Sequence, residues 1–565
     1  MWHWFKSSLQ AHPELAIFLT LALGFFIGKL RIKSVTLGSV TGTLLAGVLV
    51  GQLEIQIPDL VKTVAFIGFL FALGYRVGPQ FFAALRKDGV PQLVVAVIGA
   101  VFGLLVAYVM AKIMGYGPGW GAGLLAGGLT QSAVIGVATD AINGSTSIPD
   151  DQKKTFIDQI PVGYAVCYLF GTAAAAYFLS QLAPRMLGTK DLAGECAEME
   201  KKLGTFHDPD SQPAYRQVVR RTYQVTAGSE LDGTSVRAEE ALAASRGRRI
   251  YLQRYRRGDE LEFTTPDTVL RAGDVVTVTA NHSDFIHGEM TAVGTEIDDA
   301  ELLGYDVETM AIVLTRKELV GRKLGDLAED ALARNLFVKR IVRAGVEIPF
   351  GLTTVLHRGD ELTVEGPKEL VEKAIPALGK PNRSSDETDY SYIGAGIVLG
   401  GLIGIPTVAI AGAQIGLTTS GGALIMGLVF GWLRAKYPTF GRFPPAAEWL
   451  MDTGGLCMFV GIVGIQSGPN FISGVKSQGV GLLFAGLVVT LLPMFLTLFL
   501  GKLVYKWPTA TNLGSTAGAF TTTASIGAIC DTAKSRVPVL GYTVPYAIGN
   551  TLLTIWGTVI VALLS

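Results

Sequence analysis

Arg76 is the side chain whose type and place in the sequence most directly indicate chemistry. It lies inside the apolar run 61–84, where a centrally placed arginine costs about 2.5 kcal/mol or more to insert into a bilayer. A guanidinium binds a carboxylate through two parallel hydrogen bonds. We therefore expect Arg76 to bind a substrate that carries a carboxylate. The alternative is an ion pair with an internal acid such as Glu448 or Asp452.

The sequence around Arg76 occurs twice, as the motif G-x-x-x-G-P-x-F. The two copies are 390 positions apart, and a neutral glutamine replaces the arginine in the second. Each proline frees a backbone carbonyl, and glycines let a ligand come close; tight packing between kinked helices is the alternative. The motif residues that we expect at a substrate site are Gly74, Gly78, Pro79, Gln466, Gly468 and Pro469.

A second repeat, at a shift of 391 positions, brings polar side chains together at two matching points. The stretches 120–145 and 507–531 are rich in Gly, Thr and Ser, which predicts broken rather than straight helices. Hydroxyl and unpaired N–H groups at such breaks can bind an anion, or the hydroxyls cap their own backbone. The expected site residues here are Thr130, Gln131, Ser132, Thr521, Thr522 and Thr523.

The composition indicates a membrane protein with an additional soluble region. Of the 565 residues, 49% are hydrophobic and 17% are charged, against about 25% charged in soluble domains. The 47 basic and 47 acidic residues give no sign of nucleic-acid binding. The four cysteines form no C-x-x-C pair, so we expect neither disulfides nor a zinc site. The sequence holds no metal cluster or nucleophile–base pair, and we expect no cofactor and no enzymatic activity.

The apolar runs divide the chain into two halves, residues 1–183 and 386–565, around a charged insert. Matching residues recur in the other spans at shifts of 380 and 378 positions, so the halves form a repeat. Lys62 and Asp452 are among the matched pairs, near span starts where snorkelling to the interface is the default explanation. Runs long enough to cross a bilayer lie near 13–30, 36–53, 61–84, 91–114, 160–183, 391–411, 416–433, 449–470, 478–504 and 540–564.

Basic residues in short loops predict which side of the membrane each loop faces, because they favour the cytoplasm. They follow the first and third runs of the first half, as at Lys29 and Arg86, but the second and fourth runs of the second half, as at Arg434 and Lys502. Corresponding loops then face opposite sides. We expect an inverted repeat of two five-span halves, each with a re-entrant hairpin that reaches the midplane. Both termini would lie outside and the insert in the cytoplasm.

The insert, residues 184–385, predicts an α+β region with a repeat of its own. Leu270–Asp274 matches Leu356–Asp360, and a short strand follows each copy. The pattern resembles the TrkA-C (RCK-C) module of potassium-transport regulators, present twice, over 184–295 and 296–385. No G-x-G-x-x-G turn precedes the copies, so we expect no NAD or ATP site. The copies would sense a ligand or serve a structural or dimerising role.

The whole arrangement resembles the aspartate:alanine exchanger family of secondary transporters. The resemblance rests on two membrane halves with G-x-x-x-G-P-x-F motifs, Arg76 in the first, around a paired TrkA-C insert. It implies a bacterial inner-membrane antiporter for small amino acids or carboxylates; in the exchangers that name the family, aspartate enters as alanine leaves. We further expect alternating access, a homodimer and a small anionic or zwitterionic substrate. The alternatives are a dicarboxylate (succinate) exporter of the same fold and a cation channel or cation-coupled transporter gated by the TrkA-C pair.

Overall fold

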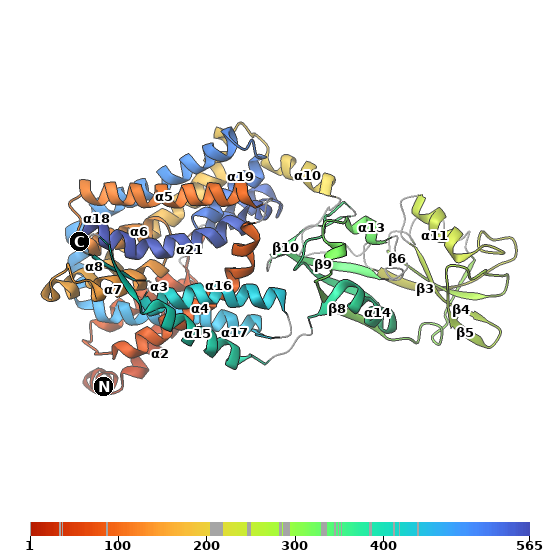
Figure 1. Cartoon of the computed structure of the whole chain (residues 1–565), viewed down its shortest axis with the longest axis horizontal. Coiled ribbons are helices and arrows are strands. Elements are labelled where there is room, and N and C mark those ends of the chain that lie inside the picture. The colour runs from red at the N-terminus through yellow and green to blue at the C-terminus, as the bar shows by residue number, and fades with distance from the viewer. Residues whose placement is uncertain are drawn as a thin grey trace. The chain divides into compact units, whose positions relative to one another are not determined.

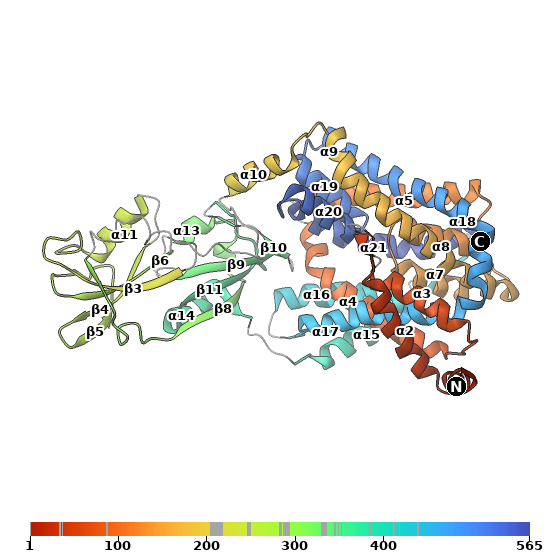
Figure 2. The same ribbon diagram turned by 180° about the vertical axis from the view of Figure 1, so that it is seen from behind.

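The computed structural model contains two compact units (Figure 1, Figure 2). The membrane unit comprises residues up to Met199 and from Ser384 onward, and the soluble unit comprises Glu200–Arg343 and Glu347–Arg383. The expected boundary after residue 183 lies before the end of the first membrane segment at Met199, whereas the expected boundary at 386 is close to Ser384. These domain boundaries stay a prediction. The structure describes residues 2–32, 35–36, 38–85, 89–203, 218–245, 250–281, 285, 294–328, 336–343, 346–348, 350–351, 353–382, 387–410, 413–416, 418–437 and 440–565.

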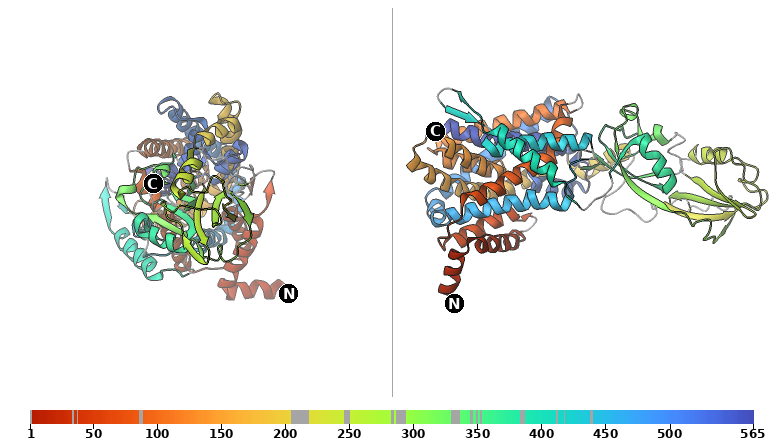
Figure 3. Two further views of the ribbon diagram at one scale, coloured as in Figure 1. Left: turned by 90° about the vertical axis from the view of Figure 1, so that its right-hand side faces the viewer. Right: turned by 60° about the horizontal axis from the view of Figure 1, so that its bottom comes forward.

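The membrane unit is mostly helical, and short β-hairpins join some of its helices. Its first half contains α1 (Trp2–Ala11), α2 (Pro13–Gly28), α3 (Ser39–Gly51), α4 (Asp59–Ala84), α5 (Val90–Ile113), α6 (Pro118–Gly128), α7 (Ala133–Gly144), α8 (Asp150–Tyr177), the π-helix η1 (Phe178–Leu182), α9 (Ala183–Met186) and α10 (Leu192–Leu203). Its second half contains α15 (Tyr390–Gly404), α16 (Thr418–Lys436), α17 (Pro445–Trp449), the π-helix η6 (Leu450–Gly454), α18 (Gly455–Leu503), α19 (Thr509–Ala519), α20 (Thr523–Ala533) and α21 (Val539–Leu564). The hairpins are β1 (Arg31–Ile32) with β2 (Val35–Thr36), and β13 (Thr407–Ile410) with β14 (Ala413–Gly416), the latter visible in the right-hand view of Figure 3.

The helices pack into two bundles, each built from both halves of the chain. The motif bundle, which holds both G-x-x-x-G-P-x-F copies, consists of α2, α3, α4, α15, α16, α17 and the first part of α18. The hairpin bundle consists of α5 to α8, the second part of α18 and α19 to α21. In the motif bundle α4 packs on α16 and α18 packs on α3, while in the hairpin bundle α6 packs on α8 and α19 on α21. The α4–α16 pair therefore corresponds to the α18–α3 pair, and the α6–α8 pair corresponds to the α19–α21 pair.

Glycines at the motif let the helices of the motif bundle approach closely. A Cβ at Gly74 or Gly78 would meet the α16 backbone at Leu424 or Leu428, and one at Gly468 would meet Val48 of α3. The sequence predicts a broken helix at each motif proline, and this is wrong, because α4 continues past Pro79 and α18 past Pro469. The carbonyls that these prolines free, of Tyr75 and Ile465, instead face Gly431 of α16 and Gly51 of α3. Such Cα–H···O contacts replace part of the lost hydrogen bond.

Helix α18 is longer than the sequence predicts. We expect separate spans over 449–470 and 478–504, but the helix is continuous from Gly455 to Leu503. Its first part packs on α3, and its second part donates from Thr490 Oγ1 to the carbonyl of Gly128 at 2.7 Å. A straight helix of 49 residues would be about 73 Å long, roughly twice the hydrocarbon thickness.

Apolar length alone supports fewer spans than the ten that the sequence predicts. Among the described residues, five helices are long and apolar enough to cross a membrane, or six if α1 and α2, bent by 109°, count as one. Other expected spans fall on shorter apolar helices, α3 and α15, and on α16. The five-crossing halves and the inverted orientation therefore stay predictions.

The backbone conformation repeats at the same shifts as the residues. Positive φ angles occur at Gly38 and Thr418, at Gly115 and Lys506, and at Thr130 and Thr521. The last pair lies in the breaks that the sequence predicts, between α6 and α7 and between α19 and α20. Each break is closed alike: Gln131 N donates to the Ala126 carbonyl at 2.8 Å, and Thr522 N donates to the Ala517 carbonyl at 3.0 Å. The two helix–break–helix segments are thus built in the same way.

The soluble unit contains two five-stranded antiparallel sheets with the same strand order. The first has the order β5-β4-β6-β3-β7 and the second β10-β9-β11-β8-β12. The elements of the first copy are β3 (Val218–Gln224), α11 (Val236–Ser245), β4 (Tyr251–Arg257), β5 (Glu260–Phe263), β6 (Val275–Asn281) and β7 (Thr295–Ile297). Those of the second are β8 (Val307–Leu314), the 3-10 helix η4 (Lys317–Leu319), α13 (Leu324–Ala328), β9 (Phe337–Arg343), β10 (Val346–Ile348), β11 (Glu361–Pro367), α14 (Lys368–Leu378) and β12 (Gly379–Pro381).

Ion pairs hold equivalent places in the two sheets. Arg257 Nη2 lies 2.7 Å from Asp274 Oδ2 in the first copy, and Arg343 Nη2 lies 2.8 Å from Asp360 Oδ2 in the second. Both aspartates belong to the Gly-Asp turns that the sequence repeats. The turn that identifies each copy is therefore tied to its own sheet by a bidentate pair.

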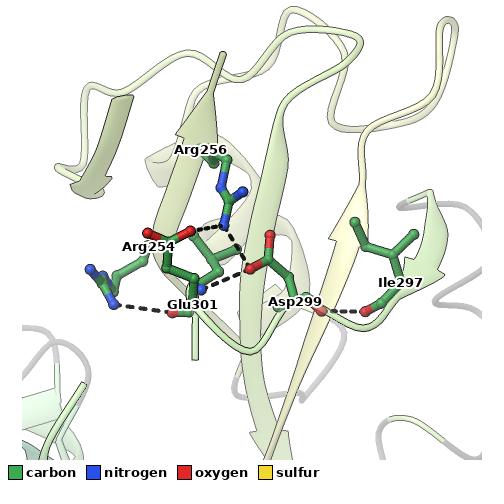
Figure 4. Close-up of polar contacts among 7 residues, drawn as sticks. Arg254, Arg256, Ile297, Asp299 and Glu301 are labelled. Carbon is green, nitrogen blue, oxygen red and sulfur yellow. Dashed lines mark hydrogen bonds and ion pairs between the residues drawn. The ribbon is translucent and has the colours of Figure 1, made fainter. Parts of the chain in front are cut away.

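The connection between the copies is fastened to strand β4 (Figure 4). Arg256 Nη2 donates to Asp299 Oδ1 at 2.7 Å and to Glu301 Oε2 at 3.2 Å. Arg254 Nη1 donates to the Leu302 carbonyl at 3.2 Å, and Thr222 donates to the carbonyl of Ile297. These contacts fix the path from β7 to β8.

Candidate functional site

Arg76 forms an ion pair with Asp452 inside the motif bundle. Its Nη1 lies 2.5 Å from Asp452 Oδ2, and its Nη2 donates to the Tyr546 hydroxyl at 3.2 Å. The Asp452 side chain is 8% exposed, but that of Arg76 is 38% exposed. In this conformation Arg76 therefore pairs with an internal acid, as the alternative interpretation of the sequence states. Part of its guanidinium stays open to another ligand.

Local helix geometry sets the position of each partner. Gly74 and Gly78 bring the backbone of α4 close to α16 on either side of Arg76. Asp452 lies in the π-helix η6 (Leu450–Gly454), and π-bulges widen a helix and recur at functional sites. Glu448, on α17, lies one turn before Asp452. The two carboxylates are therefore on neighbouring turns, and Asp452 contacts Arg76.

A chain of hydrogen bonds links Arg76 to the break between α6 and α7. Tyr546, which Arg76 contacts, lies one turn before Asn550 on α21, and Asn550 Nδ2 donates to the Tyr546 carbonyl at 3.2 Å. Gln131 Nε2 in turn donates to Asn550 Oδ1 at 3.1 Å. The sequence interpretation does not include Tyr546 and Asn550 at the site. The signal that could have found one of them is the repeated tyrosine at positions 168 and 546.

The two breaks meet each other. Thr130 Oγ1 donates to the carbonyl of Phe520 at 2.9 Å, so the first break touches the second. Ser132 and the Tyr164 hydroxyl lie 2.7 Å apart, and Thr522 Oγ1 lies 2.9 Å from Ser525 Oγ. Thr521 Oγ1 is buried without a hydrogen-bond partner. The structure thus brings together most of the polar residues predicted at the breaks.

Other predicted site residues lie apart from the Arg76 pair. Thr523 is the first residue of α20 and is exposed, and Pro469 is exposed as well. Gln466 accepts a hydrogen bond from Lys62 Nζ at 3.1 Å, on the part of α18 beside the start of α4. The motif glycines contact neighbouring helix backbones. A role in substrate binding for these residues remains a prediction.

The arrangement can bind a zwitterion. The guanidinium of Arg76 suits a carboxylate, and the carboxylates of Asp452 and Glu448 suit an ammonium group. Among the described residues no group of three or more His, Cys, Asp or Glu side chains could hold a metal ion. The site lies where α4 of the motif bundle meets α21 of the hairpin bundle, and such contacts between bundles can rearrange as rigid bodies move.

Comparison with known families and proteins agrees with this architecture. A family model described as a predicted permease membrane region, Asp-Al_Ex, matches residues 16–184 and 392–562, and a TrkA-C domain model matches residues 221–287. An uncharacterized transporter of Shewanella oneidensis is 38% identical over 567 residues, covering 100% of both chains. An uncharacterized transporter of Bordetella parapertussis is 38% identical over 562 residues, covering 98% of this chain and 97% of the other. One of Francisella tularensis is 32% identical over 572 residues, covering 100% and 99%. No solved structure matches.

Proposed function

The chain belongs to the Asp-Al_Ex family of membrane permeases, and on that premise we propose that it is a secondary antiporter that exchanges small amino acids, aspartate for alanine. That it is a multi-pass membrane transporter follows from the family and from relatives named as transporters along their whole length. The substrate pair, the direction of exchange and the residues that bind substrate are the proposal.

The observation that carries the proposal is the pair of Arg76 with Asp452. A substrate α-carboxylate takes the place of Asp452 on the guanidinium, and the substrate ammonium takes the place of Arg76 beside Asp452. Arg76 and Asp452 then each exchange one charged partner for another. Neither charge is left buried and unpaired, a state that would cost about 3–5 kcal/mol. An α-amino acid carries both groups, whereas succinate has no ammonium group and would leave Asp452 without a cation. The site therefore favours amino acids over succinate.

The neighbouring contacts fit alternating access. Tyr546 and Asn550 join Arg76 to Gln131 at the first break. Substrate that replaces Asp452 therefore acts on a contact that spans the motif and hairpin bundles. When the bundles rearrange, the site opens to the other side. An empty carrier returns slowly because Arg76, held by Asp452, keeps its hydrogen bond to Tyr546 across the two bundles. The inner-membrane location, the cytoplasmic insert and a homodimer belong to the same proposal.

Counterflow in liposomes that hold the purified protein tests the proposal. Labelled aspartate is outside, and the lumen holds alanine, aspartate, succinate or buffer in turn. Uptake with a lumenal amino acid and little with buffer is expected. Uptake into a buffer-filled lumen, or potassium flux without aspartate uptake, would overturn the exchange in favour of a uniporter or a gated channel. Succinate as the best lumenal partner would favour the dicarboxylate exporter.

A further inference from the structure

Helix α4 carries a second cation on the same face as Arg76. Lys62 precedes Arg76 by 14 residues, which is close to four helical turns and a rise of about 21 Å. Across from them, Asp452 and Gln466 have the same spacing in the second half. Arg76 contacts Asp452, and Lys62 contacts Gln466. The α4 and η6–α18 segments thus lie antiparallel, with a polar contact near each end.

Lys62 is largely buried, and its ammonium lies between Gln466 and the exposed first residue of α4. Its Nζ lies 2.9 Å from Asp59 Oδ1 and donates to Gln466 Oε1 at 3.1 Å. The side chain of Lys62 is 12% exposed, while that of Asp59 is 79% exposed. Gln466 also donates to the Ile57 carbonyl at 3.3 Å, which holds its amide towards the start of α4. Since the ammonium reaches back to the exposed first residue of α4, the snorkelling that the sequence favours for Lys62 stays a prediction.

The hairpin bundle places carboxylates near Lys62. Asp158 of α8 contacts Asn470, which lies one turn after Gln466 on α18, and Asp140 lies one turn after Gly136 on α7, where a Cβ would meet the ring of Phe66. Asp140 accepts a hydrogen bond from Ser420 of α16, and Asp158 Oδ2 accepts one from Asn470 Nδ2 of α18 at 3.1 Å. Both hydrogen bonds join the two bundles. Among the described residues, the Lys62 end therefore holds Lys62, Lys154 one turn before Asp158 on α8, and hydrogen-bonded carboxylates at a contact between bundles.

Aromatic rings separate the two ends. Phe66, one turn after Lys62, has its ring centroid 4.4 Å from that of Phe459 and 6.0 Å from that of Phe69. A Cβ at Gly136 of α7 would meet the Phe66 ring, so the ring also packs on the hairpin bundle. These apolar rings therefore pack between the two polar ends of α4.

We propose that Lys62, Asp140 and Asp158 form a second binding station for the zwitterionic amino acid, open to the face opposite to that served by Arg76. The proposal rests on the proposed function and deepens it. The substrate carboxylate binds Lys62 Nζ in place of Gln466, and the substrate ammonium lies between Asp140 and Asp158. The contacts of those aspartates with Ser420 and Asn470 then release as the bundles rearrange. Each face of the carrier thus has its own cation for the carboxylate.

The test measures KM for aspartate from each face separately, in intact cells and in everted vesicles. Lys62→Gln should raise KM about tenfold at one face only, as expected for the loss of one charge-assisted hydrogen bond. Asp140→Asn should raise KM at the same face, and Lys62→Arg should restore it. The matched control is Lys153→Gln, which removes a cation that pairs with the exposed Asp150 at the start of α8 and donates to the Asn143 carbonyl.

The outcomes separate this proposal from the proposed function. A KM change at one face supports the station. An unchanged KM, or an equal change at both faces, overturns the station and leaves exchange in place if the unaltered protein still exchanges. Failure of the unaltered protein to exchange overturns both. If Lys62→Gln does not fold, Lys62→Arg and Asp140→Asn give the same comparison.

Discussion

Unequal burial of the Arg76–Asp452 pair predicts unequal costs for removing its two members. Arg76→Gln leaves Asp452, 8% exposed, without its cation, and should cost about 3 kcal/mol, the lower end of the range for a broken buried pair. Asp452→Asn leaves Arg76, 38% exposed, and should cost about 1 kcal/mol because solvent compensates. The double variant should cost less than Arg76→Gln alone, since no buried charge is left.

Thermal unfolding of the purified protein in detergent measures this order through the melting temperature. The expected order, from least to most stable, is Arg76→Gln, the double variant, Asp452→Asn and the unaltered protein. Arg185→Gln, at an exposed arginine of α9, is the control and should melt like the unaltered protein. Substrate should raise the melting temperature of the unaltered protein and fail to do so in Arg76→Gln. A double variant less stable than both single variants would show that the two residues act independently, which would contradict a buried pair.

Four further predictions follow from the packing. Tyr546→Phe removes the hydroxyl that Arg76 contacts and should raise the counterflow KM about fivefold to tenfold, the effect of one hydrogen bond, with unchanged melting temperature. Gly74→Val should prevent stable expression because its side chain meets the α16 backbone, whereas Gly401→Val, which has open space, should express normally. In the full chain, Arg343→Ala removes the cation that pairs with Asp360, which is 1% exposed, and should destabilise the second sheet by about 3 kcal/mol. Proteolysis within 296–385 should then be faster than in the control Arg237→Ala, whose ion pair is exposed. In a chain without native cysteines, Thr146→Cys and Lys534→Cys, at exposed positions after α7 and α20, should be labelled from opposite faces of the membrane; labelling from one face would contradict the inverted repeat.

The sequence predicts the helix–break–helix segments because glycine, threonine and serine at matching positions change the local backbone. The positive φ angles at Thr130 and Thr521 lie in those stretches. It does not predict that α4 and α18 continue past their prolines, since the glycines that receive the freed carbonyls, Gly431 and Gly51, are on other helices. The continuity of α18 likewise depends on tertiary packing and not on local apolar runs.

The candidate site was predictable only where a residue is unusual in its local sequence. Arg76 stands out because an arginine in an apolar run is costly, and the sequence names Asp452 as a possible partner. Tyr546 and Asn550 do not stand out, because tyrosine and asparagine in a span have no signature until the fold places them between Arg76 and Gln131. The burial of Lys62 is equally a property of its neighbours, Gln466 above all.

The most direct test of the exchange of aspartate for alanine is its response to a membrane potential. Aspartate carries one more negative charge than alanine, so each cycle moves one charge, worth about 2.3 kcal/mol per 100 mV. Labelled aspartate uptake into alanine-filled proteoliposomes is measured with the lumen clamped positive, at zero and negative. An inside-positive potential is expected to accelerate uptake and an inside-negative one to slow it, and Arg76→Gln should take up no aspartate. Equal uptake at all three potentials would contradict the proposed pair.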